Sequence, residues 1–188
     1  MDHSRILQDI GGMIIEGRIF KARKHILSEY PHRYIEYDTR SMSDEEKLKI
    51  FIRDGFIDRY SGNKLLFPSV LRIISQELGE IFPFHTNWKM SDCHIAYWEM
   101  MPTCDHILPI ARGGKDIPEN IVTTSQIMNS AKSSFILEEI GFNIHPAGDI
   151  NAWDGMISWY KEYVYKNPAI LQNNYISKWH NALTRFEG

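Results

Sequence analysis

The fold expected for this chain is decided by one stretch, Cys104-Asp105-His106-Ile107-Leu108-Pro109-Ile110-Ala111-Arg112-Gly113-Gly114. Two shorter stretches complete it further along the chain, Glu119-Asn120-Ile121 and Met128-Asn129-Ser130-Ala131-Lys132. Together they place acidic, imidazole, amide and ammonium side chains at fixed spacings between apolar residues. Such a mixture of side chains is typical of a functional site rather than of a hydrophobic core.

The local pattern around these stretches predicts a small β-β-α unit. Residues 104–109 and 119–124 favour two short strands, separated by the Gly113-Gly114 turn. A helix is expected from about Ser125 to Glu139, with Gly141 ending it.

The side chains of this unit suit one another chemically. Asp105 is a hard oxygen ligand suited to Mg²⁺ or Mn²⁺, and Asn129 can offer an amide oxygen to the same metal. His106 is the side chain best able to take a proton near neutral pH. Asn120, on the second strand, is a natural partner to fix the imidazole across the hairpin. Lys132 shares a helix face with Asn129 and can meet a phosphate.

A base, a metal on two oxygen ligands and a cation together make a site that hydrolyses phosphodiester bonds. One feature conflicts with simple geometry, because adjacent residues of a regular strand point to opposite faces. Asp105 and His106 can serve one site only if the end of their strand is twisted or irregular. We therefore predict an irregular strand end.

The pattern D-H-I-x-P, then G-G, then E-N, then N-x-x-K resembles the HNH endonucleases, the ββα-metal (His-Me finger) nucleases, over Asp105 to Ser134. The resemblance implies that His106 is the general base that activates water. It implies that Asp105 and Asn129 are the two protein ligands of one divalent cation. Asn120 then corresponds to the asparagine that holds the histidine, and Lys132 to a helix lysine near the scissile phosphate.

The flanks extend the resemblance to stand-alone bacterial HNH proteins, at Tyr60-Ser61-Gly62 and at Phe82-Pro83-Phe84-His85-Thr86-Asn87-Trp88. Two departures from many family members bear on the metal. The chain has no paired C-x-x-C knuckles, so structural zinc is not expected. The last motif residue is asparagine rather than histidine, which favours Mg²⁺ or Mn²⁺ over softer metals.

Composition limits the kind of nucleic-acid binding. The chain has 188 residues, of which 43% are hydrophobic, which argues against disorder. It carries 21 Lys and Arg against 24 Asp and Glu, a net charge of −3, which argues against a generally basic, histone-like binder. A local basic groove around Arg112, Lys115 and Lys132 is still expected, extended by the basic stretch 18–40. DNA binding should then be modest and sensitive to salt.

The start of the chain and its cysteines are both typical of a cytoplasmic protein. The first residues do not read as a targeting signal, and no run is long and apolar enough for a membrane span, so a cytoplasmic protein is expected. The two cysteines, Cys93 and Cys104, are expected to be buried or partly buried thiols. Two cysteines also exclude a four-cysteine structural zinc site within one chain.

The class expected is α+β, mostly helical, around the small ββα-metal (HNH) core. Helices are predicted over residues 4–27, 43–57 and 68–78, a hairpin over 59–67, and two helices after residue 150 with Trp and Tyr stripes that suit a core or an interface. We expect an N-terminal helical region 1–57, a nuclease core 58–141 and a C-terminal helical region 142–188 in one compact unit.

Two functions remain open at this level. The first is a metal-dependent DNA endonuclease that uses one Mg²⁺ or Mn²⁺. The second is a catalytically silent ββα module that binds nucleic acid or docks a partner. Double-stranded DNA is the default substrate, with single strands and RNA left open, as are sequence specificity and a restriction, other defence or mobile-element role. A homodimer would allow both strands to be cut, but the sequence does not show one.

Overall fold

The computed structural model describes residues 3–32 and 42–188. The chain divides into two compact units, Met1–Tyr37 and Asp38–Gly188. This division differs from the expected single unit with a boundary after residue 57. The helix that covers most of 43–57 packs on the β-sheet and on the last helix of the chain, so it belongs to the second unit.

The first unit contains a helical hairpin. Helix α1 (His3–Ile15) and helix α2 (Ile19–Glu29) pack against each other. The prediction of one helix over 4–27 is therefore wrong at its middle. The break falls at Gly17, whose φ of +73° favours glycine, whereas Gly11 and Gly12 both lie inside α1.

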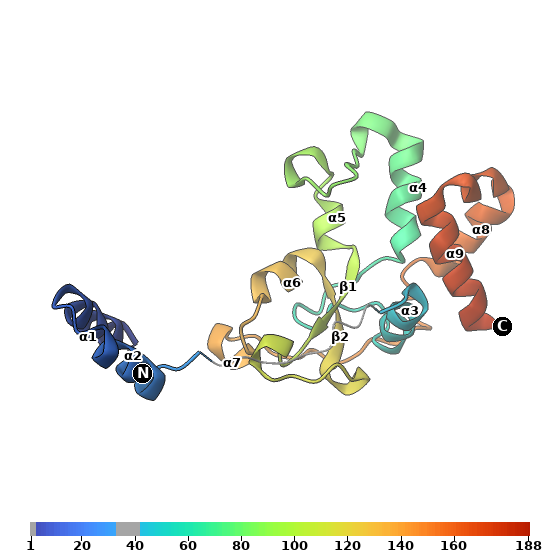
Figure 1. Ribbon diagram of the computed structural model, residues 1–188. Helices are drawn as coiled ribbons and strands as arrows, with labels where there is room; N and C mark the ends of the chain where they lie inside the picture. Colours follow the sequence, from blue (N-terminus) through green and yellow to red (C-terminus); the bar gives the residue numbers. More distant parts are fainter. Residues whose placement is uncertain (1–2, 33–41) are drawn as a thin grey trace. The chain divides into compact units, whose positions relative to one another are not determined.

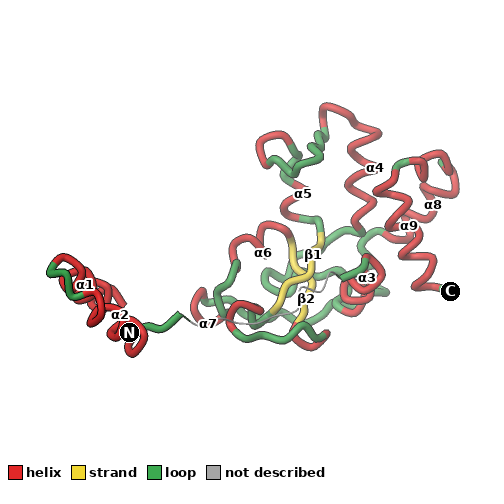
Figure 2. Tube along the Cα trace, in the orientation of Figure 1, coloured by secondary structure: helices red, strands yellow, loops and turns green. Residues whose placement is uncertain are grey.

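The second unit is mostly helical (Figures 1 and 2). Its α-helices are α3 (Asp44–Arg53), α4 (Pro68–Leu78), α5 (Ala96–Glu99), α6 (Gln126–Lys132), α7 (Leu137–Ile140), α8 (Ile157–Lys166) and α9 (Asn174–Glu187). Short 3₁₀ turns are η1 (Gly79–Ile81), η2 (Met90–Asp92), η3 (Ile110–Arg112), η4 (Pro118–Asn120) and η5 (Pro168–Gln172). Within the described residues of both units, no helix is long and apolar enough to cross a membrane.

The helix starts follow the signals in the sequence. Ser43 and Glu46 form the expected capping box at the start of α3. Pro68 occupies the first turn of α4, where its missing N–H costs nothing. The helix expected from Ser125 to Glu139 is interrupted, because Ser133 adopts a φ of +48° and ends α6 after one and a half to two turns.

Two strands form a small antiparallel sheet, which confirms the α+β class. Strand β1 (Pro102–His106) pairs with β2 (Ile121–Ser125), with His106 opposite Ile121. Both strands lie slightly off the expected ranges, because the chain bends directly after His106 and Pro118 starts η4 instead of a strand. The hairpin expected over 59–67 is reduced to one bridge between Ile57 and Lys64.

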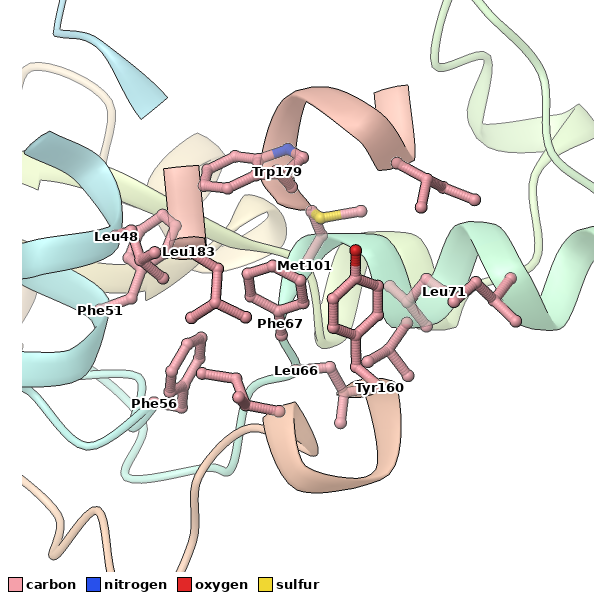
Figure 3. Close-up of a cluster of buried hydrophobic side chains, with 14 of the residues drawn as sticks. Leu48, Phe51, Phe56, Leu66, Phe67, Leu71, Met101, Tyr160, Trp179 and Leu183 are labelled. Carbon is pink, nitrogen blue, oxygen red and sulfur yellow. The ribbon is translucent and has the colours of Figure 1, made fainter. Parts of the chain in front are cut away.

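A single hydrophobic core holds α3, α4, α8 and α9 together (Figure 3). Tyr160 is fully buried and Trp179 is 6% exposed, so the aromatic stripes of the last two helices belong to the core. The sequence alone predicts either a core or an interface for them. The rings of Phe51 and Phe67 both pack against Trp179. The sheet lies beside this core, with α3 in contact with both strands.

The cysteines meet the expectation of buried or partly buried thiols. Cys93 is buried and Cys104 is partly buried, and both are free. Burial raises the pKa of the Cys104 thiol to about 12. This thiol is therefore protonated at neutral pH.

Candidate functional site

The side chains predicted to form the site come from three consecutive elements. Asp105 and His106 are the last two residues of β1. Asn120 immediately precedes β2, and Asn129 and Lys132 lie one helical turn apart on α6. Helix α6 packs on both strands, so these three elements are neighbours in space as well as along the chain (Figure 1).

Asp105 is held by two donors on one of its oxygens. Its Oδ2 accepts a hydrogen bond from the Tyr60 hydroxyl at 2.6 Å and lies 2.8 Å from the Lys132 Nζ. Burial, and after it the bond to Asp105, raises the pKa of the Tyr60 phenol far above its usual value, so this hydroxyl stays protonated and donates. The Asp105 side chain is only 13% exposed and its orientation is fixed by these contacts.

Lys132 does not have the role expected from its sequence position. Its side chain is fully buried, and its Nζ donates to the His106 carbonyl oxygen at 2.7 Å in addition to pairing with Asp105. A buried ammonium with two protein partners cannot lie in an open basic groove. The expectation that Lys132 contacts a phosphate is therefore corrected: it ties α6 to the end of β1.

His106 has a carboxylate partner from the loop between the strands. Its Nε2 lies 2.9 Å from Asp116 Oδ1, and the two side chains are 28% and 24% exposed. The His106 Nδ1 makes no hydrogen bond with the described residues. The second ring nitrogen is therefore open to a water molecule.

The expected irregularity at the end of β1 is not present. Asp105 and His106 stay in register with Val122 and Ile121, so their side chains alternate as in any strand. Asp105 points toward Lys132 of α6, whereas the partner of His106, Asp116, lines a cavity with residues of α3. The two groups leave the strand end on opposite faces.

Asn120 braces the loop rather than the imidazole. Its Oδ1 accepts from the Leu108 N–H at 2.9 Å, and its Nδ2 donates to the Leu108 and Lys115 carbonyls at 3.0 and 2.9 Å. Both ends of its amide are thus used on backbone groups of the 107–117 loop. The prediction that Asn120 holds His106 directly is corrected, because its hydrogen bonds fix the loop instead.

Two oxygen donors of the predicted metal site remain without a hydrogen-bond partner among the described residues. Asp105 Oδ1 and the Asn129 amide make no hydrogen bond with the described residues, and α6 presents Asn129 on the same side as Lys132. Two such oxygens with water would suit Mg²⁺ or Mn²⁺. Among residues 3–32 and 42–188, no group of three or more His, Cys, Asp or Glu side chains is arranged to hold a metal ion. The Lys132 ammonium beside Asp105 would weaken cation binding.

Two cations of the expected basic groove lie on the surface. Arg112 is 43% exposed and pairs with Glu139 at 2.6 Å, and Lys115 is exposed on the neighbouring loop. Residues 33–40 of the basic stretch 18–40 lie outside the described residues, and 18–32 belong to the first unit. Of the three cations expected to form a basic groove, Arg112 and Lys115 are therefore exposed, and Lys132 is buried.

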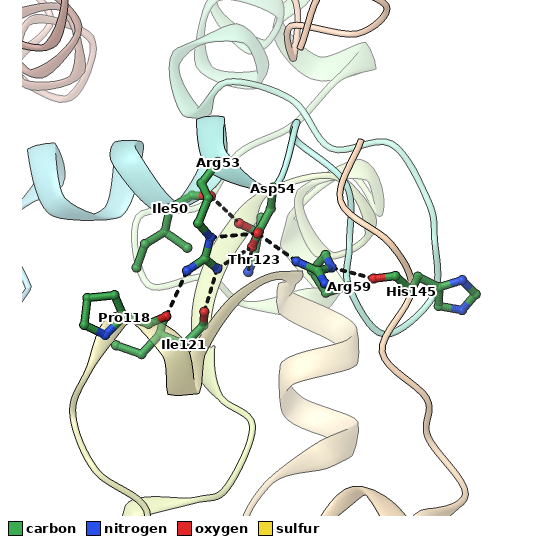
Figure 4. A network of polar contacts seen from close by, with 8 residues as sticks. All are labelled: Ile50, Arg53, Asp54, Arg59, Pro118, Ile121, Thr123 and His145. Carbon is green, nitrogen blue, oxygen red and sulfur yellow. Dashed lines mark hydrogen bonds and ion pairs between the residues drawn. The ribbon is translucent and has the colours of Figure 1, made fainter. Parts of the chain in front are cut away.

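Strand β2 is held in place by a buried carboxylate (Figure 4). Asp54 is fully buried, and its Oδ2 accepts from the Thr123 N–H at 2.8 Å. Its oxygens also accept from the guanidinium groups of Arg53 and Arg59. Arg53 continues to the Ile121 carbonyl at 2.7 Å, so the start of β2 is fixed from α3.

A second buried carboxylate fixes the end of β2. Asp58 is fully buried, its Oδ1 accepts from the Thr124 hydroxyl at 3.0 Å, and its Oδ2 accepts from the Ser125 N–H at 2.9 Å. Its Oδ1 also accepts from the backbone N–H of Tyr60, which fixes the turn that presents the Tyr60 hydroxyl to Asp105. The position of Asp105 therefore depends on residues far away in sequence.

Sequence reasoning did not identify Asp54, Asp58 or Asp116 as parts of this site. Asp58 carries a local signal, since an aspartate followed two residues later by a backbone donor is typical of an Asx turn. Asp116 stands between two motif residues, Gly114 and Asn120, in a loop whose length places it near the strand end. Asp54 has no local signal, because its partners become neighbours only when α3 packs on the sheet.

We expect Gly114→Ala to lower the free energy of unfolding by about 1–3 kcal/mol. A Cβ at this position would lie 1.9 Å from the Leu108 carbonyl oxygen and 3.0 Å from Asn120 Nδ2, so the loop backbone has to move. Urea denaturation measures the change. The comparison variant is Gly113→Asn, where a Cβ meets nothing within 4 Å, so its cost comes only from the positive φ of +91°, which asparagine adopts more readily than most residues. Equal stability of the two variants would contradict the packing described for Gly114.

No protein-family model matches the sequence, and comparison with curated proteins and with solved structures gives no similar protein.

Proposed function

We propose that this chain is a metal-dependent endonuclease of the HNH kind, which hydrolyses DNA phosphodiester bonds. The observation that carries the proposal is the order of groups at the end of β1. Asp105 and His106 are the last residues of the strand, Asn120 braces the loop that follows, and α6, the helix that carries Asn129, packs on the same strand. The family resemblance of these residues supports the same reading.

In this proposal the phosphodiester lies across the end of β1, since Asp105 and His106 leave the strand on opposite faces. Asp105 and Asn129 would hold one Mg²⁺ or Mn²⁺. When bound, this cation stabilises the charge that develops on the leaving oxygen. His106 accepts a proton from the attacking water at Nδ1. Arg112 and Lys115 supply exposed positive charge for the DNA backbone.

A second candidate is the catalytically silent ββα module that binds nucleic acid or a partner. Two observations favour it. The buried Lys132 ammonium already neutralises Asp105, and His106 and Asp105 point to opposite faces of the sheet. A divalent cation titrated into the protein in a calorimeter separates the two functions, because only the nuclease requires the cation.

The proposed function is tested by plasmid cleavage with the full chain. Wild-type protein with Mg²⁺ or Mn²⁺ is expected to nick or cut supercoiled DNA, and EDTA is expected to stop the reaction. His106→Ala should slow cleavage by at least about 10²–10⁴-fold, the usual contribution of a general base. Circular dichroism and thermal unfolding check that the variant is folded.

The matched control is His145→Ala, which removes the side chain of an exposed histidine of the second unit and should leave cleavage unchanged. Two results would contradict the proposal: no cation-dependent cleavage by the wild type, or equal cleavage by wild type and His106→Ala. Sequencing the ends of the cut plasmid then separates a specific cutter from a nicking enzyme and from a non-specific nuclease. Parallel reactions with single-stranded DNA and RNA define the substrate class.

The oligomeric state belongs to the same proposal. A two-fold dimer would bring two single-cation sites to the two strands of a duplex. Light scattering of the full chain with and without duplex DNA measures this directly. A monomer that only nicks would agree with one site per chain.

A further inference from the structure

The contact between His106 and Asp116 has no counterpart in the motif that suggested the nuclease function. Asp116 follows ten residues after His106, in the loop between the two strands. Its Oδ1 lies 2.9 Å from His106 Nε2, and both side chains are about three-quarters shielded from solvent. This is a directed contact between a base candidate and a carboxylate.

Asn120 cannot orient the ring, because its whole amide is used elsewhere. Its three hydrogen bonds go to backbone groups of Leu108 and Lys115. The bond to the Lys115 carbonyl fixes the residue directly before Asp116. Asn120 therefore acts on His106 through the loop, by holding the backbone from which Asp116 projects.

The other ring nitrogen of His106, Nδ1, determines what the imidazole can do. An ionised carboxylate accepts hydrogen bonds and cannot donate one, so the contact favours the tautomer with the proton on Nε2. In that tautomer Nδ1 carries the lone pair, and this nitrogen makes no hydrogen bond with the described residues. A water molecule at Nδ1 would meet a proton acceptor with a fixed orientation.

We propose that Asp116 is the positioning residue of His106: its carboxylate accepts the Nε2–H, fixes the ring and its tautomer, and leaves Nδ1 to activate water. This inference rests on the proposed function for its catalytic meaning. The orientation and the tautomer can be measured without any reaction.

Nitrogen NMR of the His106 ring in the full chain is the first experiment. Spectra of the neutral imidazole, assigned with His106→Gln, should show the Nε2–H tautomer in the wild type. Asp116→Ala should lose this preference, and Asp116→Glu, which keeps a carboxylate, should retain most of it. Glu119→Ala, an exposed acidic residue of the same loop, is the control and should leave the spectrum unchanged.

Cleavage kinetics are the second experiment. Asp116→Ala should lower kcat by about 10²-fold, as a misplaced reacting group does, with KM within about twofold of the wild type. Asp116→Glu should restore part of kcat, and Glu119→Ala should match the wild type. A ring spectrum that is the same in wild type and Asp116→Ala overturns the role of Asp116. Absence of cleavage by the wild type overturns the proposed function instead, so the two failures are distinct.

Discussion

Replacing Asp54 by alanine is expected to lower the free energy of unfolding by about 3–5 kcal/mol, the usual cost of breaking a buried charge network from one side. Asp54 is fully buried, and its two oxygens accept from Arg53, Arg59 and the Thr123 N–H. Removal of the carboxylate leaves the buried Thr123 N–H without its acceptor and takes a charged acceptor from two guanidinium groups. The free energy is measured by urea denaturation followed by circular dichroism.

The control for Asp54 is Glu45→Gln, which breaks the exposed pair between Glu45 and Lys49 on the same helix. Exposed pairs of this kind contribute less than about 1 kcal/mol. A loss below 1 kcal/mol for Asp54→Ala would show that the network does not hold β2. The start of β2 adjoins Asn120. Any activity of Asp54→Ala should therefore fall in proportion to the fraction of molecules that is unfolded.

Replacing Lys132 by methionine is expected to lower the free energy of unfolding by about 3 kcal/mol. Methionine fills a similar volume, so the cost comes from the Asp105 carboxylate and the His106 carbonyl that lose their shared donor. Thermal and urea unfolding of the full chain provide the measurement. Lys115→Met, an exposed lysine of the neighbouring loop, should change the same quantity by less than about 0.5 kcal/mol.

A double variant separates the ion pair from simple packing. Lys132→Met combined with Asp105→Leu removes both charges, and this should recover part of the stability lost in Lys132→Met alone. Additive losses in the double variant would mean that the two side chains are not coupled. That result would contradict the buried pair described here.

The sequence was informative where a structural element is defined locally. The capping box of Ser43 and Glu46, the start of α4 at Pro68 and the glycine that ends α7 are each set by nearest neighbours along the chain. The order of the β-β-α elements also followed from short patterns. The break of α6 at Ser133 was not predicted, because neither glycine nor proline stands there.

The candidate site was predictable in its residues but not in their partners. Asp105 and His106 could be identified by type and spacing, whereas their contacts with Tyr60 and Asp116 depend on how distant loops pack. Burial of Lys132 had no signal either, since an exposed and a buried helix lysine look the same in sequence. The spacing of residues predicts which side chains share a helix face. It does not predict which of them form ion pairs or hydrogen bonds with other parts of the chain.

The support of β2 by Asp54 and Asp58 has a consequence for how other molecules can approach the sheet. A strand at the side of a sheet presents free backbone groups that recruit further strands, including those of other chains. Here the outward backbone groups of β2 are occupied: Arg53 and Arg59 donate to the Ile121 and Thr123 carbonyls, while the two aspartates accept from Thr123 and Ser125. These side chains and one loop N–H replace a third strand. β2 is therefore closed to strand addition and protected from edge-to-edge aggregation.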